Sequence, residues 1–363
     1  MGPMKQDLTA TLASLRLALA YDYRIVPMNV PGAPVFLAVA MPLAAEVTGQ
    51  KPRLPSGRGL SMPQAMVSAG AEALELRSSL ASSNLGRIAR LPRLDGRAMI
   101  EARDLRSGAA VPVPAQTVFL DHAAATGEPL DIDARSTGCA TAPDRQAATE
   151  QALLECIERD AIAFWWHGGV AAHALPLDIL DAFAPRLLWW LQTRARQTRL
   201  LGLISETGVP VVVALSSDEG GRNVAYGAAA RFNDGDASLA AVTELVQTET
   251  AFAMALAAGN DEARAWQDHA STVIQPQFNP VEDGPPPSWT PHDGGGLLDR
   301  LNALGLQALS VDLTLPGDPV PTVRVLVPGL CDMGGRIDEP RFRRHAGIVD
   351  TNLQPIRHEP EPF

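Results

Sequence analysis

Side chains that could bind a metal-phosphate group lie close together between Ser136 and Trp166. Glu155 and Glu158 are three residues apart, so both carboxylates lie on one face if this stretch is helical. Arg159 follows directly. Carboxylates suit a hard cation such as Mg²⁺, and a guanidinium can form two parallel hydrogen bonds with phosphate oxygens. The alternative interpretation is an ordinary solvated helix face.

The surrounding residues predict the helix that would carry these groups. From about Arg145 to Trp166 the chain has no Pro or Gly and is rich in Ala, Leu and Glu. The small residues 136–140 before it predict a turn with room for a close backbone approach. Four apolar residues of the helix can face a core: Ala148, Ala152, Leu153 and Ile157.

The same unit recurs twice, and this repetition favours a site over a solvated face. Each copy has a Gly/Ala turn, an Ala-rich helix and then E-x-x-E or E-x-x-Q. The other turns are Gly57-Arg58-Gly59 and Gly227-Ala228-Ala229. Three solvated faces would not require matching turns, so we predict a cluster of acidic helix ends around one site. The three pairs are Glu72 and Glu75, Glu155 and Glu158, and Glu244 and Gln247, of which the last could complete the site.

These segments resemble the YcaO family. The resemblance rests on GRGLSMPQAMVSAGAEALE, on STGCA with the following ALLECIERDAIAFWW, and on VPTVRVLVPGL. It runs from about Ser56 to Leu330, and ECIERDA is its most specific part. With the repeats, it implies an α/β (α+β) fold, a YcaO-like single domain with three internal pseudo-repeats. It also implies an enzyme that activates peptide amides with ATP.

The resemblance implies a Mg²⁺-ATP site built from paired helix glutamates. Arg324 lies inside an otherwise apolar strand, where a charge requires a partner, and the matching family arginine lies near the nucleotide. The implied ligands of Mg²⁺ are Glu72, Glu75, Glu155 and Glu158. The implied ATP-binding residues are these four together with Arg159 and Arg324.

The function that the resemblance implies is cyclodehydration of Cys, Ser or Thr in a ribosomal precursor peptide to thiazoline or oxazoline. ATP-dependent thioamidation is one alternative. A non-catalytic scaffold subunit of a peptide-modifying complex is another, because Ala147 stands where family members usually carry an acid. Glu150, one turn further on, could partly replace that acid. The tail ends in Glu-Pro-Glu-Pro-Phe, a shortened version of the family's Pro-rich tail.

Composition limits the partners and the compartment. The net charge of −11 argues against a nucleic-acid-binding surface. Neither a signal peptide nor a membrane span is visible, and three scattered cysteines do not form a disulfide framework, so we expect a cytoplasmic protein. The expected partners are the precursor peptide, a separate leader-binding protein (ThiF-like or similar) and a flavin dehydrogenase. A homodimer is left open.

The remaining pattern predicts the elements around the site. Residues 1–55 predict a helix near 8–21 and strands at 24–28 and 33–41, too little chain for a leader-binding module of their own. Residues 56–330 form the YcaO-like domain, and 331–363 form the tail. Further strands are predicted at 111–120, 208–214, 308–313 and 320–327, helices at 178–201 and 297–304, and a Pro/Gly-rich loop at 273–296. Of the adjacent Trp189 and Trp190, one is expected in the core and the other at an interface.

Overall fold

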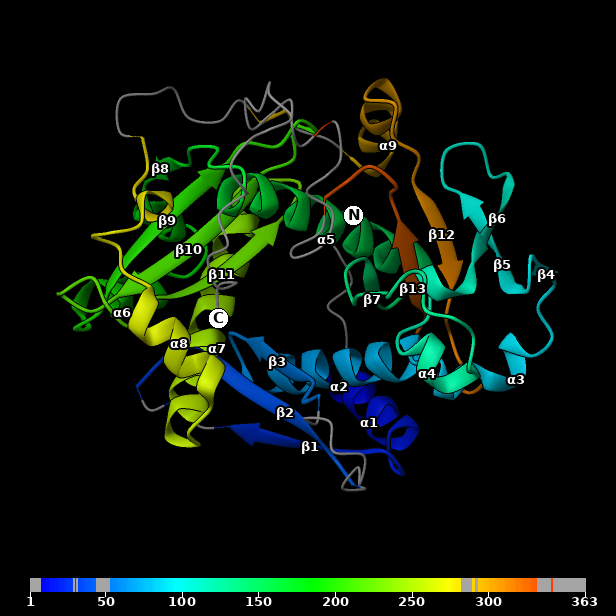
Figure 1. The fold of residues 1–363 in the computed structure, drawn as a ribbon. Helices are drawn as coiled ribbons and strands as arrows, with labels where there is room; N and C mark the ends of the chain where they lie inside the picture. Colours follow the sequence, from blue (N-terminus) through cyan, green and yellow to red (C-terminus); the bar gives the residue numbers. More distant parts are fainter. Residues whose placement is uncertain are drawn as a thin grey trace, which may run out of the picture. The chain divides into compact units, whose positions relative to one another are not determined.

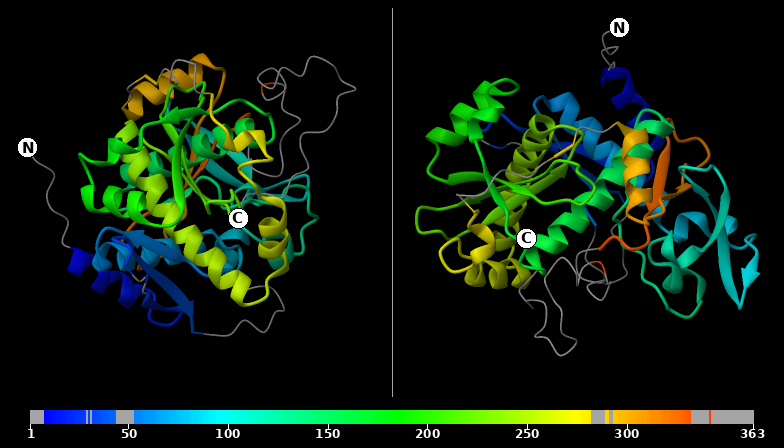
Figure 2. Two further views of the ribbon diagram at one scale, coloured as in Figure 1. Left: turned by 90° about the vertical axis from the view of Figure 1, so that its left-hand side faces the viewer. Right: turned by 90° about the horizontal axis from the view of Figure 1, so that it is seen from above.

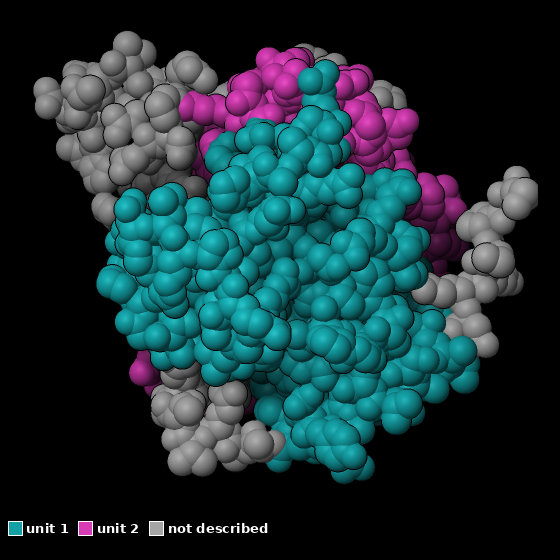
Figure 3. Space-filling model, turned by 90° about the vertical axis from the view of Figure 1, so that its right-hand side faces the viewer, with its two compact units in different colours: residues 1–31, 36–153, 307–328 teal, residues 32–35, 154–306, 329–363 magenta. Residues whose placement is uncertain are grey.

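The chain divides into two compact units, which are coloured separately in Figure 3. The structure, a computed structural model, describes residues 8–28, 30, 32–43, 53–281, 289–290, 293–331 and 341. Unit 1 comprises residues 1–31, 36–153 and 307–328. Unit 2 comprises residues 32–35, 154–306 and 329–363. The helix α5 (Arg145–Trp166) contributes residues to both units.

A three-stranded antiparallel sheet and two helices form the first part of unit 1 (Figure 1). Its strands are β1 (Tyr23–Met28), β2 (Phe36–Pro42) and β3 (Ser56–Gly59), and its helices are α1 (Leu8–Ala18) and α2 (Met62–Ser79). Ser61 begins α2, because its side chain accepts a hydrogen bond from the backbone N–H of Gln64. Apolar side chains from all of these elements except β3 pack between sheet and helices, among them Leu15, Ile25, Ala38 and Leu74.

A second sheet of unit 1 has the strand order β4-β5-β12-β13-β7, and β6 pairs with β5. The strands are β4 (Arg93–Leu94), β5 (Arg97–Asp104), β6 (Ala110–Pro114), β7 (Cys139–Thr141), β12 (Leu309–Asp312) and β13 (Thr322–Leu326). The short helices α3 (Leu85–Ile88) and α4 (His122–Thr126) accompany it. The strand predicted at 111–120 ends at Pro114, because a 3₁₀ turn at Ala115–Thr117 follows.

Unit 2 is built on a four-stranded antiparallel sheet with the order β11-β10-β9-β8. Its strands are β8 (His173–Leu175), β9 (Gln197–Leu203), β10 (Val211–Ser217) and β11 (Ala225–Ala230). Its other helices are α6 (Pro185–Thr193), α7 (Asp234–Ala257), α8 (Asp261–His269) and α9 (Gly294–Ala303). The helix α7 packs against β10 and β11 (Figures 1 and 2). Trp165, Trp166, Trp266 and Phe278 form a buried aromatic cluster.

Three predictions of local structure were wrong. The helix expected at 178–201 is a 3₁₀ turn, then α6, then β9, because Pro185 begins a new helix and the β-compatible residues 197–203 pair with β10. The glycines 294–296, expected in a loop, form the first turn of α9, where the side chain of Asp293 caps the helix. The segments around Gly57 and Gly227, expected as turns, are strands.

Glycine is required in these two strands because each lies directly on a helix backbone. A Cβ atom on Gly57 would lie 2.1 Å from the backbone nitrogen of Ala69 in α2. A Cβ atom on Gly227 would lie 2.2 Å from the backbone nitrogen of Leu245 in α7. The first and third copies of the repeat therefore share one strand-on-helix contact. When the two copies are aligned on this contact, Leu245 corresponds to Ala69. Glu244 therefore corresponds to the residue before Ala69 and not to Glu72.

We expect Gly57→Ala and Gly227→Ala each to lower the free energy of unfolding by about 3 kcal/mol, because the added methyl group overlaps backbone atoms that cannot rotate away. Gly86→Ala is the matched control, since nothing lies within 4 Å of its added Cβ. Chemical denaturation of the three variants measures the difference. Equal stability of all three would contradict the close packing of strand on helix.

The turn after β5 predicts a pH-dependent contribution to stability. Asp104 accepts hydrogen bonds from the backbone N–H of Ser107 and from the side chain of Gln307, and these bonds lower its pKa to about 2. The depressed pKa stabilises the fold above about pH 4, and this stabilisation is lost as the pH falls toward 2. We expect Asp104→Asn to cost about 2 kcal/mol at neutral pH and almost nothing near pH 2. Urea denaturation at both pH values checks this.

Candidate functional site

The predicted acidic pair and its arginine lie on one face of α5. Glu158 is buried, with 7% of its surface exposed, while Glu155 and Arg159 are half-buried. The Nη2 atom of Arg159 lies 3.6 Å from a carboxylate oxygen of Glu158, and its Nε atom lies 4.0 Å from one of Glu155. A single guanidinium therefore faces two carboxylates, as the three-residue spacing predicted.

Burial and neighbouring charges shift the pKa of both Glu158 and Arg159. Burial is the main cause that raises the pKa of Glu158 to about 7, and Arg159 opposes it. The charges of Glu244 and Glu155 raise this pKa further. For Arg159, burial alone would lower the pKa, but the surrounding carboxylates raise it overall. A cation bound beside Glu158 would lower the pKa of this carboxyl group by favouring its charged form.

The end of β11 holds Glu158 in place. The backbone N–H of Ala230 donates a hydrogen bond of 3.2 Å to its carboxylate. Arg231, the next residue, is close enough for its charge to act on Glu158, and Tyr226 on the same strand acts on Arg159. The sequence pattern did not single out Arg231 or Tyr226, because only strand pairing brings β11 to α5.

Asp160, the next residue of the ERD motif, has a different role. It is 1% exposed and forms a bidentate ion pair with Arg341, with both N···O distances at 2.6 Å. The backbone N–H of Cys331 donates to the same carboxylate at 2.8 Å. Arg341 also pairs with Glu206 and lies over the ring of Phe164. Asp160 therefore fastens residues beyond β13 to α5, while Glu158 and Arg159 carry the charges described above.

In unit 1 the predicted glutamates lie on α2. Glu72 is exposed and accepts a hydrogen bond of 3.1 Å from the backbone N–H of Ser56, the first residue of β3. Glu75 is half-buried one turn later. The helix α2 packs against β7 and β13 as well as against β3. The helix that carries Glu72 and Glu75 is thus a neighbour of the strand that carries Arg324.

Arg324 is a buried cation without a carboxylate partner among the described residues. It lies in the middle of β13, is 3% exposed and pairs in register with Cys139 of β7. Its Nη1 atom donates a hydrogen bond of 3.0 Å to the carbonyl of Ser136, while its buried Nε–H has no acceptor in the described part of the chain. A buried and uncompensated guanidinium is costly, so this position favours a bound anion.

The turn that holds Arg324 is fixed by backbone geometry. Gly138 has a φ of +80°, which favours glycine, and its carbonyl accepts a hydrogen bond of 2.6 Å from the N–H of Val325. The predicted small-residue turn therefore ends against β13. The carbonyl of Ser136 thus accepts from the side chain of Arg324, and the carbonyl of Gly138 accepts from the backbone of the next residue.

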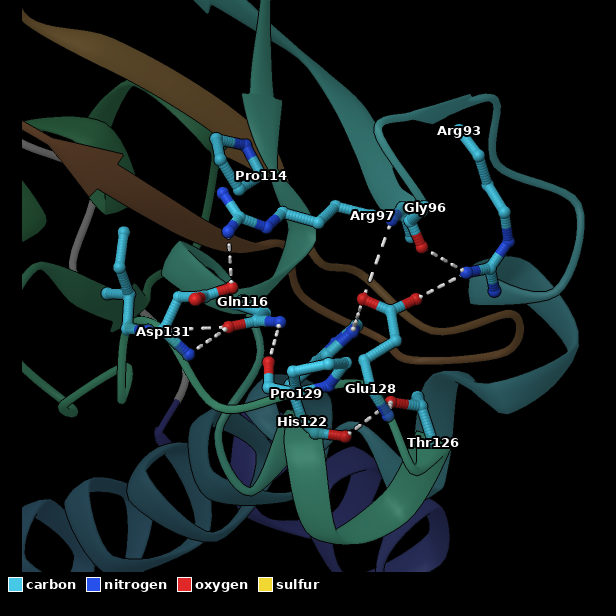
Figure 4. Close-up of polar contacts among 12 residues, drawn as sticks. Arg93, Gly96, Arg97, Pro114, Gln116, His122, Thr126, Glu128, Pro129 and Asp131 are labelled. Atoms are coloured by element: carbon cyan, nitrogen blue, oxygen red, sulfur yellow. Dashed lines mark hydrogen bonds and ion pairs between the residues drawn. The ribbon is translucent and has the colours of Figure 1, made fainter.

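A buried polar cluster anchors the segment that leads to this turn (Figure 4). Glu128 accepts hydrogen bonds from His122 at 3.1 Å and from Arg93 at 2.9 Å. Burial alone would raise the pKa of Glu128, but these partners lower it overall. The side chain of Gln116 donates to the carbonyl of Pro129 and accepts from the backbone of Asp131 and Ile132. These hydrogen bonds hold the segment several residues before Ser136 in place.

The position of the missing acid makes ordinary helix contacts. Ala147 lies in the first turn of α5, where its N–H donates to Asp144 at 2.8 Å. The carboxylate of Glu150, which could replace the missing acid, accepts a hydrogen bond of 3.0 Å from Gln146. The predicted third pair, Glu244 and Gln247, lies half-buried on α7.

Each unit by itself offers side chains that suit part of a Mg²⁺-nucleotide. Within the described ranges, no group of three or more His, Cys, Asp or Glu side chains is arranged to hold a metal ion by itself. Mg²⁺ does not require such a group, because it usually keeps several waters and is bound by one or two carboxylates plus substrate phosphates. In unit 2, the buried carboxylate of Glu158 suits the cation. In unit 1, the buried Nε–H of Arg324, which has no acceptor among the described residues, suits a phosphate. None of the described helices is long and apolar enough to cross a membrane.

Solved structures share this fold. A heterocyclase solved in complex with substrate and cofactor superimposes with a TM-score of 0.81 at 18% identity, over 98% of this chain and 57% of that one. YcaO from Methanopyrus kandleri, bound with AMPPCP and Mg²⁺, gives 0.70 at 22% identity over 97% and 95% of the two chains. The E. coli microcin synthetase McbBCD complex with pro-MccB17 bound gives 0.60 at 14% identity over 84% and 86%.

The chain spans 57% of the first heterocyclase and 44% of a second one, TruD, so those chains contain additional parts. A comparison with curated proteins gave no match.

A family model described as a YcaO cyclodehydratase that binds ATP and Mg²⁺ matches residues 92–331. This range includes α5 with its acidic pair, both arginines and the third repeat, and it covers about two thirds of the chain. The predicted α/β fold of the YcaO type and the predicted cofactors, ATP and Mg²⁺, are thereby confirmed, and the chain belongs to the YcaO family.

Proposed function

We propose that this protein uses ATP to activate backbone amides of a ribosomal precursor peptide and converts Cys, Ser or Thr to thiazoline or oxazoline. The observation that carries the proposal is the buried guanidinium of Arg324, whose Nε–H has no acceptor in the described chain. A phosphate group would supply that acceptor. The heterocyclases and the microcin synthetase of the same fold support the peptide substrate.

Each predicted site residue receives a role in this proposal. We assign Glu72, Glu75, Glu155 and Glu158 to Mg²⁺, and Arg159 and Arg324 to the phosphates. When bound, Mg²⁺ neutralises charge on the phosphate oxygens. Arg159 is already oriented by Glu155 and Glu158, so its remaining N–H groups can be directed at a phosphate without first ordering the side chain.

The reaction closes a five-membered ring in the peptide. The sulfur or oxygen atom of the Cys, Ser or Thr side chain loses its proton and adds to the carbonyl carbon of the preceding amide. The resulting oxyanion attacks the γ-phosphorus of ATP, and ADP leaves. Inorganic phosphate then departs with the former carbonyl oxygen, the amide nitrogen loses its proton and a C=N bond forms. The net change in the peptide is the loss of one water. The arginines stabilise the charge that develops on the transferred phosphoryl group.

Two other functions remain candidates. ATP-dependent thioamidation would use the same phosphate-binding residues with an external sulfur donor, and the mass of the product distinguishes it from cyclodehydration. The single observation that favours a non-catalytic scaffold is Ala147, which stands where family members usually carry an acid. Further partners belong to the proposal: a leader-binding protein, ThiF-like or similar, and a flavin dehydrogenase, with the microcin synthetase as a precedent for a multi-protein assembly.

The deciding experiment compares wild type with Ala147→Glu and Ala147→Gln. We expect the wild type to remove water from the precursor peptide in an ATP-dependent reaction when its partner protein is present. We expect Ala147→Glu to change the rate by less than about tenfold, because Mg²⁺ requires few protein ligands. Mass spectrometry of the peptide measures the reaction. A silent wild type that becomes active only with glutamate at this position would show that the natural chain is a scaffold.

A further inference from the structure

A pocket of about 300 Å³ lies on unit 2, and none of the residues assigned to Mg²⁺ and ATP lines it. Two segments far apart in the sequence form it, the turn at 32–34 and the first turns of α6. We call it the α6 pocket, and its lining residues are Gly32, Pro34, Pro185, Arg186, Trp189 and Trp190. Gly32 has a φ of +75°, and nothing lies within 4 Å of the position where its Cβ would be, so this wall of the pocket is open.

One tryptophan of the pocket is held in place, and the other is exposed. Arg194 lies over the ring of Trp190, 4.5 Å from its centre, and is itself held by a bidentate ion pair with Glu249 at 2.7 and 2.9 Å. Trp190 is therefore half-buried and fixed. Trp189, by contrast, is 66% exposed. An exposed tryptophan beside a fixed one is typical of a binding surface rather than of a core.

The polar side-chain groups of the pocket's lining residues are all donors. The indole N–H groups of Trp189 and Trp190 form no hydrogen bond with the described residues, and Arg186 has no ion-pair partner among them. No acidic side chain lines the pocket, although the whole chain has a net charge of −11. A ligand that complements the pocket must therefore supply hydrogen-bond acceptors and negative charge. The apolar part of this ligand must fit against flat rings and prolines.

One kind of ligand meets all three requirements. A polyproline II segment presents its carbonyl oxygens outward as acceptors, and its prolines have no N–H that would need a partner. Aromatic-lined grooves bind such segments by stacking prolines on the rings while indole N–H groups donate to the carbonyls. An acidic residue next to the proline would pair with Arg186.

We propose that the α6 pocket docks an extended, proline-containing acidic segment of a partner protein. This rests on the proposed function, because a peptide-modifying enzyme must assemble with proteins that deliver its substrate. It also assigns to Trp189 a role in binding that is independent of Mg²⁺ and ATP.

The experiment measures binding of a fluorescently labelled, blocked peptide of repeated Glu-Pro pairs to the full chain without nucleotide. We expect saturable binding by fluorescence anisotropy, and at least about tenfold weaker binding of Lys-Pro and Glu-Ala peptides. Trp189→Ala and Arg186→Glu should each weaken binding of the Glu-Pro peptide by at least about tenfold. The matched controls are Met254→Ala, an exposed apolar residue of α7, and Arg199→Glu, an exposed arginine of β9, and both should bind as the wild type does.

Several results would overturn the proposal. They are no saturable binding of the Glu-Pro peptide at millimolar concentration, equal binding of the Lys-Pro peptide, or equal losses in the controls. Tighter binding after deletion of residues 359–363, whose sequence is Glu-Pro-Glu-Pro-Phe, would show that the chain's own tail occupies the pocket. A dimer that dissociates on Trp189→Ala would assign the pocket to a second copy. Binding of a Mg²⁺-ATP analogue, measured on the same variants, tests the proposed function separately.

Discussion

Replacing Glu158 with Gln is expected to weaken binding of a Mg²⁺-ATP analogue by at least about 100-fold while leaving the fold intact. Losing a residue that only orients a metal ligand already costs about 10- to 100-fold in metal affinity, and we assign Glu158 to the metal itself. Glutamine preserves the acceptor for the N–H of Ala230 at 3.2 Å. It also removes a buried carboxylate whose pKa is raised to about 7, so the protein without ligand should be as stable as the wild type or more so.

Titration calorimetry with a non-hydrolysable ATP analogue, with and without Mg²⁺, measures this effect, and thermal unfolding reports on the fold. Glu219→Gln is the matched control, because Glu219 is exposed in the turn after β10 of the same unit. We expect the control to bind as the wild type does. If Glu158→Gln bound the analogue normally, or if it simply unfolded, the carboxylate would have a structural role and our assignment of the metal ligands would be wrong.

Replacing Arg324 with Met should separate stability from function. We expect the affinity for the Mg²⁺-ATP analogue to fall by about 10- to 100-fold, since charge-assisted hydrogen bonds to phosphate are lost. The unfolding temperature without ligand should stay the same or rise. The substitution loses one hydrogen bond, to the carbonyl of Ser136, but it removes a buried charge that has no carboxylate partner in the described chain.

Arg87→Met provides the contrast. Arg87 is also partly buried, but its guanidinium donates a hydrogen bond of 2.8 Å to the carbonyl of Asp312 and lies over the ring of Phe119. We expect its loss to destabilise the fold by about 1–3 kcal/mol and to leave nucleotide affinity unchanged. Differential scanning calorimetry with and without the analogue compares the two variants. A large loss of stability in Arg324→Met with unchanged affinity would make Arg324 a structural residue.

The sequence by itself determined the parts of this protein that local patterns control. The absence of Pro and Gly between Arg145 and Trp166 gave α5 its length, and the spacing of Glu155 and Glu158 put both carboxylates beside Arg159. Helical periodicity and side-chain spacing involve residues only a few positions apart, so a single segment of the sequence is enough to predict their effects. The family resemblance, carried by short motifs, identified the fold and the cofactors in the same way.

Local patterns did not predict the strands that contain Gly57 and Gly227. Each glycine was expected to form a turn, yet each lies in a strand that pairs with its neighbour. Glycine is required there because a helix later in the sequence leaves no space for a Cβ. The adjacency of β11 to α5 likewise depends on a sheet, and only this adjacency brings Arg231 and Tyr226 to the acidic pair.

Tertiary structure alone also decided which charges are neutralised. The sequence shows Arg324 as a charge within an apolar strand and predicts that it requires a partner, while it assigns no role to Asp160. Folding brings Arg341 to Asp160 across 181 residues and gives it a complete ion pair. Folding also buries Arg324, whose guanidinium donates one hydrogen bond to a backbone carbonyl. The Nε–H of Arg324 has no acceptor among the described residues. Burial and long-range contacts set the electrostatic free energy of each charged group, and the sequence pattern contains neither. Only the fold therefore distinguishes a charge that is already paired from one that is suited to bind phosphate.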